Sequence, residues 1–180
     1  RLNELGMLVD VSHCSEQVGF DAIEVSSTPV IVTHSASNAV CYHDRGKGDE
    51  LARAIAENGG FFGVAAIGGF LRSDNNTTLD DFADHVEHLV DVMGIDHVGI
   101  GTDYTQDQPE SFWRYIGSQQ GTKHPSTFYD GSRRPWERSL YPAGLETTDR
   151  LPDLAVALAA RGYKPDDVDK VLGANWLRFF

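Results

Sequence analysis

The stretch MLVDVSH at residues 7–13 decides the fold, because it is a short aliphatic run that ends in polar side chains. The stretch PVIVTH at residues 29–34 repeats this pattern, and each run is followed by a longer amphipathic segment. Similar runs cover residues 61–67 and 97–103. Short apolar runs that alternate with helical segments are typical of successive βα units on a parallel sheet.

Helix signals occupy the segments between these runs. Ser15 is a plausible N-cap for a helix that must end before Pro29, and Thr78 with Asp81 three residues later has the spacing of a capping box. Glycines end two of the predicted helices. The helices are predicted at residues 15–28, 49–59, 78–94, 151–161, 165–172 and 175–180.

The whole chain, residues 1–180, is predicted to be a single domain with one long insertion. Residues 104–148 are rich in aromatic residues, proline and serine, and they are too many for an ordinary connection. We expect this segment to be a functional, lid-like loop. The chain begins at Arg1 inside a helical pattern, so we also expect further sequence upstream.

Composition excludes several classes of function. The 27 acidic and 15 basic residues give a net charge of −12, which opposes binding to nucleic acid or to anionic membranes. No apolar run approaches the roughly 20 residues of a membrane-spanning helix. Cys14 and Cys41 cannot build a disulfide framework, so we expect a reducing, cytoplasmic location.

Three of the predicted strands end on chemically capable side chains, namely His13, His34 and Asp103. Both a TIM barrel and an open doubly wound sheet place ligands at the carboxyl ends of parallel strands. Four strands cannot close an eight-stranded barrel. Under the barrel interpretation, this chain supplies about half of the barrel.

The two histidines could bind one divalent metal ion, because neighbouring strand ends project into the same cleft. Zinc takes three or four protein ligands, so His13 and His34 would need further ligands. Asp103 could be one of these, or it could act as a base toward water. The alternative interpretation is a polar strand terminus with hydrogen-bonded histidines.

The chain resembles the membrane (renal) dipeptidase family of zinc peptidases over nearly its whole length. The resemblance rests on motifs that occur in the family's order. These are GMLVDVSH at 6–13, PVIVTHS at 29–35, AENGG at 56–60, DHVGIGTD at 96–103, GLE at 144–146 and GANWLR at 173–178. It implies a (β/α)8 TIM barrel, with this chain as its C-terminal half, and zinc-dependent hydrolysis of dipeptides through a metal-bridged hydroxide. It also implies about two zinc ions per complete chain.

The resemblance implies roles for four residues. His13 and His34 match the two histidine ligands of the family's second zinc. Asp103 matches the aspartate that handles the proton of the bridging water, and Arg45 matches the arginine that holds the substrate's carboxylate. A guanidinium fork suits a terminal carboxylate. The alternative for Arg45 is a salt bridge within its loop, to Asp44 or Asp49.

The sequence departs from the family at two places. The family's other metal ligands all precede Arg1, so no residue of this chain represents them. After Asp103 the family continues Phe-Asp-Gly, whereas this chain has Tyr104-Thr105-Gln106 and then the aromatic insertion. An altered insertion could narrow the substrate pocket, admit a larger substrate or cover an oligomer interface.

Two alternative functions remain open at this point. The first is a metal-dependent amidohydrolase that acts on a non-peptide amide, ester or lactone. The second is a non-catalytic barrel that serves as a binding module. The expected partners are a small dipeptide and a second copy of the chain in a homodimer.

His85 and His88 are expected on the solvated face of their helix, or at its border, with acidic neighbours.

Overall fold

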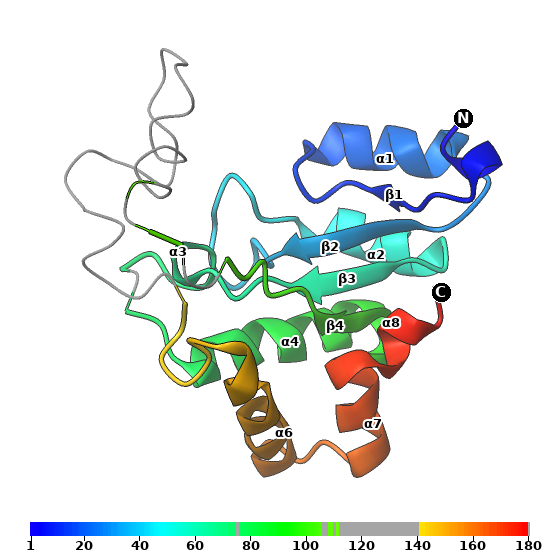
Figure 1. The fold of residues 1–180 in the computed structure, drawn as a ribbon. Helices are drawn as coiled ribbons and strands as arrows, with labels where there is room; N and C mark the ends of the chain where they lie inside the picture. The colour runs from blue at the N-terminus through cyan, green and yellow to red at the C-terminus, as the bar shows by residue number, and fades with distance from the viewer. Residues whose placement is uncertain (75, 106–107, 110, 112–140, 180) are drawn as a thin grey trace.

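The computed structural model describes residues 1–74, 76–105, 108–109, 111 and 141–179. Most of the predicted insertion, including its tryptophan and phenylalanine residues, lies outside the described residues, so its predicted lid-like role stays a prediction. The remainder forms one parallel sheet flanked by helices (Figure 1).

The sheet contains four parallel strands in the order in which they occur in the chain. All four predicted strands are present. β2 is as long as its sequence pattern and shifted by one residue, whereas β1, β3 and β4 are shorter than theirs because their last residues lie beyond the ladder. Their bounds are β1 Val9–Asp10, β2 Val30–Ser35, β3 Phe61–Val64 and β4 Val98–Ile100. Sequential parallel order with helical crossovers is the topology expected for part of a barrel.

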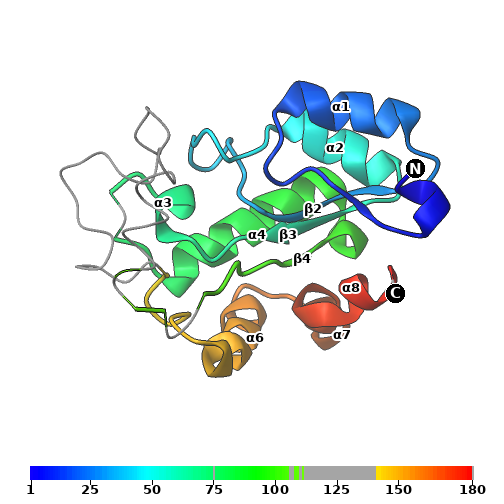
Figure 2. The ribbon, with the colours of Figure 1, turned by 45° about the horizontal axis from the view of Figure 1, so that its top comes forward.

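Helices α1, α2 and α4 pack side by side against one face of the sheet, whereas α6, α7 and α8 lie beyond β4 (Figures 1 and 2). Their bounds are α1 Glu16–Val25, α2 Asp49–Glu57, α3 Gly68–Leu71, α4 Leu79–Met93, α6 Leu151–Ala160, α7 Pro165–Asp169 and α8 Asn175–Leu177. Short 3₁₀ turns cover Asn3–Leu5, Ile95–His97 and Thr148–Arg150, and a π-type turn covers Lys170–Ala174. The predicted helices are therefore present, with α1, α7 and α8 shorter than expected.

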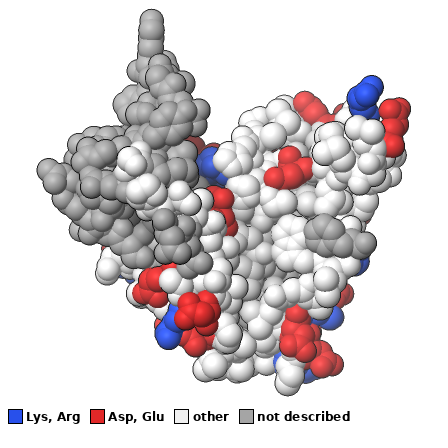
Figure 3. Space-filling model, in the orientation of Figure 1, with Lys and Arg blue, Asp and Glu red and all other residues white. Residues whose placement is uncertain are grey.

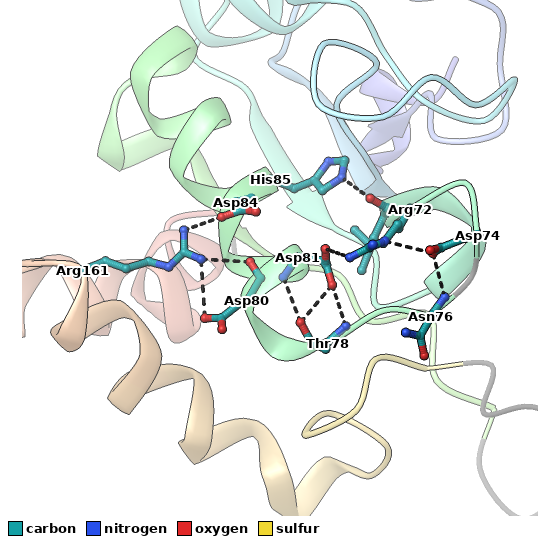
Figure 4. A network of polar contacts seen from close by, with 10 residues as sticks. Arg72, Asp74, Asn76, Thr78, Asp80, Asp81, Asp84, His85 and Arg161 are labelled. Atoms are coloured by element: carbon teal, nitrogen blue, oxygen red, sulfur yellow. Dashed lines mark hydrogen bonds and ion pairs between the residues drawn. The ribbon is translucent and has the colours of Figure 1, made fainter.

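The predicted caps fix the helix starts. The Ser15 hydroxyl accepts a hydrogen bond from the backbone N–H of Val18, and Thr78 and Asp81 form a reciprocal capping box at the start of α4 (Figure 4). Arg161 donates to Asp84 at 2.6 Å, which ties the end of α6 to α4. These contacts hold α4 against the sheet, where it supports the loops after β2 and β3.

Both faces of the sheet are buried. On the helix side, fully buried residues of β2 and β3 pack against α2 and α4, namely Val30, Val32, Phe62 and Val64 against Leu51, Ile55, Phe82, Val86 and Leu89. On the other face, the ring of Phe61 packs against Trp176, with 4.3 Å between ring centroids. Near-continuous apolar strands are typical of parallel sheets for this reason.

A bulge in β2 shapes the end of the sheet that carries the polar residues. From Val32 to Ser35 the chain advances three residues, while its partner β3 advances two, from Phe62 to Val64. The extra residue brings the carbonyl group of Thr33 over Gly63 and Gly101, where any β-carbon would overlap it. The two glycines therefore permit the bulge, which re-aims the side chains that follow.

The surface agrees with the acidic composition. On the face drawn in Figure 3, acidic side chains gather over the helices below the sheet, with basic side chains among them. Two of the ion pairs are Arg150 with Asp153 and Lys170 with Asp96. Among the described residues, no helix is both long and apolar enough to span a bilayer.

Candidate metal centre

The carboxyl ends of the strands meet at the end of the sheet near α3 (Figure 1). His13 follows β1, His34 lies within β2, and Asp103 follows β4. The structure thus brings together the three strand-end residues that the sequence predicts, because parallel strands all deliver their ends to the same edge.

His13 and His34 point their rings at one another. Their Nε2 atoms are 2.9 Å apart, and their ring centroids are 5.0 Å apart. In a tetrahedral zinc site with N–Zn bonds of about 2.0–2.1 Å, two nitrogen ligands lie about 3.3 Å apart. The two imidazoles therefore converge on one point, and a spread of a few tenths of an ångström would fit a zinc ion between them. The residues present fit the metal.

Two histidines alone are too few ligands for a zinc ion. Within the described ranges, no third His, Cys, Asp or Glu joins the pair in a group that could hold a metal ion. Cys14, next to His13, is a free and partly buried thiol outside any such group. A zinc ion at this point therefore requires ligands from elsewhere in the complete protein.

A hydrogen-bonded cluster supports His34 from behind. The Nδ1 atom of His34 lies 2.8 Å from the Thr33 hydroxyl, and that hydroxyl lies 2.8 Å from Oδ2 of Asp10. The Ser12 hydroxyl bonds Oδ1 of Asp10 at 2.5 Å and accepts the backbone N–H of His34 at 3.1 Å. Thr33 also donates its backbone N–H to Asp10. The cluster joins the strands that end in His13 and His34.

The electrostatics of the cluster favour an ionised Asp10 and a neutral His13. Burial raises the pKa of Asp10, but hydrogen bonds from Ser12 and Thr33 outweigh it and hold this pKa below its ordinary value. Burial lowers the pKa of His13, and the nearby Arg45 charge and His34 lower it further, while Asp103 opposes the shift. A neutral imidazole is the form that binds metal.

Arg45 lies in the loop after β2, with its guanidinium turned into the protein. Among the described residues, nothing hydrogen-bonds its Nε and Nη2 atoms, although both are buried. The guanidinium carbon lies 5.4 Å from the centroid of the Phe70 ring, a cation–π contact. The salt bridge weighed as an alternative is not formed within the described chain, where Asp49 instead bonds His88 at 2.8 Å.

The backbone around Arg45 is held firmly. Its N–H donates to Nδ1 of His43 at 3.0 Å, and its carbonyl accepts the Ser35 hydroxyl at 2.6 Å. Burial lowers the pKa of the guanidinium, while the charges of Asp103 and Asp10 raise it. Because arginine stays protonated in proteins, Arg45 is a fixed cation, and two of its donor atoms have no acceptor within the described part of the chain.

Asp103 has a left-handed backbone, with φ of 57°. Such a conformation is uncommon for a non-glycine residue and turns the chain sharply after β4. The side chain is exposed, and its charge acts on both His13 and Arg45. The four residues singled out from the sequence therefore lie within electrostatic reach at one site.

His85 contradicts the expectation of a solvated position. It is fully buried, and its Nδ1 accepts the backbone N–H of Ser37 at 3.1 Å. Its Nε2 donates to the carbonyl of Leu71 at 3.1 Å, the contact drawn from His85 in Figure 4. Backbone groups of two loops satisfy the imidazole, so a polar side chain can lie in the core. His88 is partly exposed and paired with Asp49, as expected for the border of a solvated face.

Sequence reasoning missed two other residues near the site. Lys47 is 2% exposed, and its ammonium donates to the carbonyl of Cys14 at 2.6 Å, next to His13. Tyr104 donates to the carbonyl of Leu145 at 2.6 Å and packs edge-to-face on Tyr141. Tyr104 stands where the family pattern has phenylalanine, and its hydroxyl ties the segment after Asp103 to residues 141–145. This difference from the family pattern is the feature of the sequence that could have identified Tyr104.

The chain is similar to proteins of one known family. The model of the family described as membrane dipeptidase (peptidase family M19) matches residues 1–113. The dipeptidase ataJ of Aspergillus terreus is 32% identical over 175 residues, which cover 96% of this chain and 35% of the relative.

Solved structures agree with this match. An amidohydrolase from Pseudomonas aeruginosa has a TM-score of 0.87 and 31% identity, over 99% of this chain and 53% of its own. A metallopeptidase from Rhodobacter sphaeroides, solved with a phosphinate mimic of the dipeptide L-Ala-D-Ala, has a TM-score of 0.76 and 27% identity, over 99% of this chain and 43% of its own. The prediction of an α/β chain that forms the C-terminal half of a TIM barrel is confirmed. The chain spans between about a third and about half of the length of these relatives.

Proposed function

Because this chain belongs to the membrane dipeptidase family, peptidase family M19, we propose that the complete protein hydrolyses the peptide bond of dipeptides with zinc. His13 and His34 hold one of about two zinc ions, as in other two-metal hydrolytic sites. Arg45 binds the free carboxylate of the substrate, and Asp103 handles the proton.

One observation carries the proposal: a half-buried guanidinium lies beside two converging imidazoles, and its buried Nε and Nη2 atoms have no hydrogen-bond partner among the described residues. Buried donors without partners are costly, so this arrangement suits a ligand that accepts their hydrogen bonds. A carboxylate can satisfy two N–H donors of arginine at once. A dipeptide carries that carboxylate a short distance from its single peptide bond, which suits a metal centre next to Arg45.

The chemistry divides among the residues as follows. Bound zinc supplies a Lewis acid that polarises the carbonyl group and lowers the pKa of water. Arg45 fixes the carboxyl end of the substrate, and thereby the position of the scissile bond. Asp103 accepts a proton from the attacking water. It returns this proton to the leaving nitrogen as the C–N bond breaks, so the products are a free carboxylate and a free amine.

Replacing His34 with alanine in the full-length protein tests the metal role. His34→Ala should abolish zinc-dependent hydrolysis of dipeptides. His88→Ala is the matched control, since it removes an imidazole that pairs with Asp49 on the helix surface, and it should retain activity. Full activity in His34→Ala would overturn the proposal.

A second candidate is a metal-dependent amidohydrolase that acts on a non-peptide amide, ester or lactone. The likeness to the Pseudomonas aeruginosa amidohydrolase favours it. A panel of dipeptides, N-acyl amino acids and lactones distinguishes the dipeptidase from this second candidate. Arg45 should favour substrates with a free carboxylate next to the scissile bond. A binding module without catalysis would bind these compounds and leave all of them intact.

The association into a homodimer and the cytoplasmic location remain expectations. Light scattering on the full-length protein checks the first, with twice the chain mass as the expected result. Fractionation of the source cells checks the second.

A further inference from the structure

Asp10, Ser12 and Thr33 form a hydrogen-bonded cluster behind His34. The donors and acceptors in this cluster determine the direction of the hydrogen bonds between His34 and Asp10. This inference rests on the proposed metal-binding role of His34. We infer that Asp10, acting through the Thr33 hydroxyl, fixes His34 in the tautomer that carries its proton on Nδ1 and leaves Nε2 free to bind a metal ion.

The hydroxyl of Thr33 has one proton and three neighbours that could accept it, one of which is the Ser12 hydroxyl at 3.0 Å. Oδ2 of Asp10 and Nδ1 of His34 both lie 2.8 Å from its oxygen. An ionised carboxylate can only accept hydrogen bonds, whereas a neutral imidazole nitrogen can do either. If the hydroxyl donated to His34 or to Ser12, the oxygens of Thr33 and Asp10 would face each other at 2.8 Å with no proton between them. The hydroxyl therefore donates to Asp10 and accepts from the Nδ1–H of His34.

The rest of the cluster holds Asp10 in that acceptor role. Its Oδ1 atom accepts the backbone N–H of Ser12 at 3.0 Å, the backbone N–H of Thr33 at 3.0 Å, and the Ser12 hydroxyl. Three donors on Oδ1 and one on Oδ2 stabilise the charged carboxylate. Asp10 therefore cannot rotate away or become a donor without breaking several hydrogen bonds.

The tautomer of His34 also determines which of the two histidines donates the hydrogen bond between them. With its proton on Nδ1, His34 presents a lone pair at Nε2, so the contact of 2.9 Å between the Nε2 atoms has His13 as the donor in the metal-free protein. Asp10 and Thr33 are positioning residues, since they act on the metal through His34. Partners of this kind commonly change metal affinity by about 10- to 100-fold.

The substitution Asp10→Asn removes the acceptor of the Thr33 proton without changing the shape of the side chain. An asparagine oxygen can take the place of Oδ1 and keep the donors from Ser12 and Thr33. Its NH₂ group then stands at the place of Oδ2 and donates to the Thr33 hydroxyl, whose proton is free to turn toward Nδ1 of His34 or toward the Ser12 oxygen, 3.0 Å away. His34 is then no longer held with its proton on Nδ1, and the tautomer with the proton on Nε2, the atom that should bind the metal, gains population.

Tautomers are read from imidazole ¹⁵N shifts in long-range ¹H–¹⁵N spectra of the metal-depleted, full-length protein. We expect a protonated Nδ1 at His34 in the natural protein and in Thr33→Ser, and a larger share of protonated Nε2 in Asp10→Asn. Thr33→Val, which keeps the shape and removes the hydroxyl, should leave a mixture. A protonated Nε2 at His34 in the natural protein would overturn the inference.

Zinc affinity, measured by competition with a chromophoric chelator, is the second readout. Asp10→Asn and Thr33→Val should weaken it about 10- to 100-fold, and Thr33→Ser should stay within a few-fold of the natural protein. Equal affinity in all four proteins would overturn the inference. Neither readout uses catalysis, so a protein that shows these shifts but cleaves no dipeptide would refute the proposed function alone. Circular dichroism spectra check that each variant is folded.

Discussion

The α-carbon of Gly101 in the segment after β4 lies against the carbonyl group of Thr33, so closely that a β-carbon on Gly101 would overlap the carbonyl oxygen. Thr33 belongs to the bulge that carries His34, and its carbonyl is backbone that cannot rotate away. The geometry of the candidate metal centre thus depends on a glycine two strands away.

Gly101→Ala should therefore displace the bulge as well as destabilise the fold. Overpacking of this kind costs about 1–3 kcal/mol, measurable by urea denaturation, and zinc affinity should fall with it. Gly94→Ala is the matched control, because Gly94 has φ of 85° and open space around its α-carbon. It should lose stability through its backbone while keeping zinc affinity. Unchanged zinc affinity in a folded Gly101→Ala protein would contradict this account.

The burial of His85 predicts a pH dependence of stability. Burial lowers its pKa, as does the nearby His88, while its bond to the Leu71 carbonyl and the charge of Asp84 oppose the shift. The unfolded chain then binds a proton at a higher pH than the folded protein does. The free energy of unfolding should be fullest above pH about 6.5, and it should fall as the pH drops from there toward the folded pKa.

His85→Gln removes this titration and keeps a donor and an acceptor in the side chain. Urea denaturation at a series of pH values should give a flatter dependence below pH about 6.5 for the variant than for the natural protein. The carboxylates with lowered pKa values act in a more acidic range, so they do not mask the difference. Identical slopes would show that His85 is not the responsible group.

Tyr104→Phe should destabilise the segment that follows Asp103. The change leaves the carbonyl of the fully buried Leu145 without its donor, which costs about 1–3 kcal/mol. Tyr42→Phe is the matched control, since Tyr42 is 76% exposed and its hydroxyl lies 3.4 Å from Asp44. Denaturation midpoints compare the two. An equal, small effect would mean that the Tyr104 hydroxyl does not anchor this segment.

Arg45→Ala should weaken the hydrolysis of dipeptides about 10- to 100-fold in kcat/KM, because a charged hydrogen-bonded pair is lost. The loss should appear mainly in KM. Dipeptide amides, which lack the free carboxylate, provide the comparison, since they gain little from the guanidinium in the natural enzyme. An equal loss on both substrates would contradict the carboxylate-binding role.

The strands and the meeting of His13 with His34 could be predicted, because the apolar runs are distinct and parallel strands end at one edge. The resemblance added Arg45, whose place next to the pair depends on a loop that no local pattern describes. Among the described residues Arg45 forms no salt bridge, and this could not be predicted, since it depends on Asp49 pairing with His88 instead.

The bulge at Thr33 and the burial of His85 lay beyond the sequence pattern. The bulge depends on contacts with Gly63 and Gly101, which belong to two other runs of the sequence. The sequence shows only that each of these runs contains a glycine, and not which residue the glycine contacts. His85 belongs in the core because Ser37 and Leu71, both distant in sequence, supply its partners. Helical periodicity places such a residue at a border and cannot tell which side it faces.

The metal content of the full-length protein, purified without chelators or added metal and measured by mass spectrometry, tests the central claim most directly. The account predicts about two zinc ions per chain, the number typical of two-metal hydrolytic sites. A protein that contains no metal, and takes up none when zinc is added, would leave His13 and His34 as hydrogen-bonded strand-end histidines and would contradict the account.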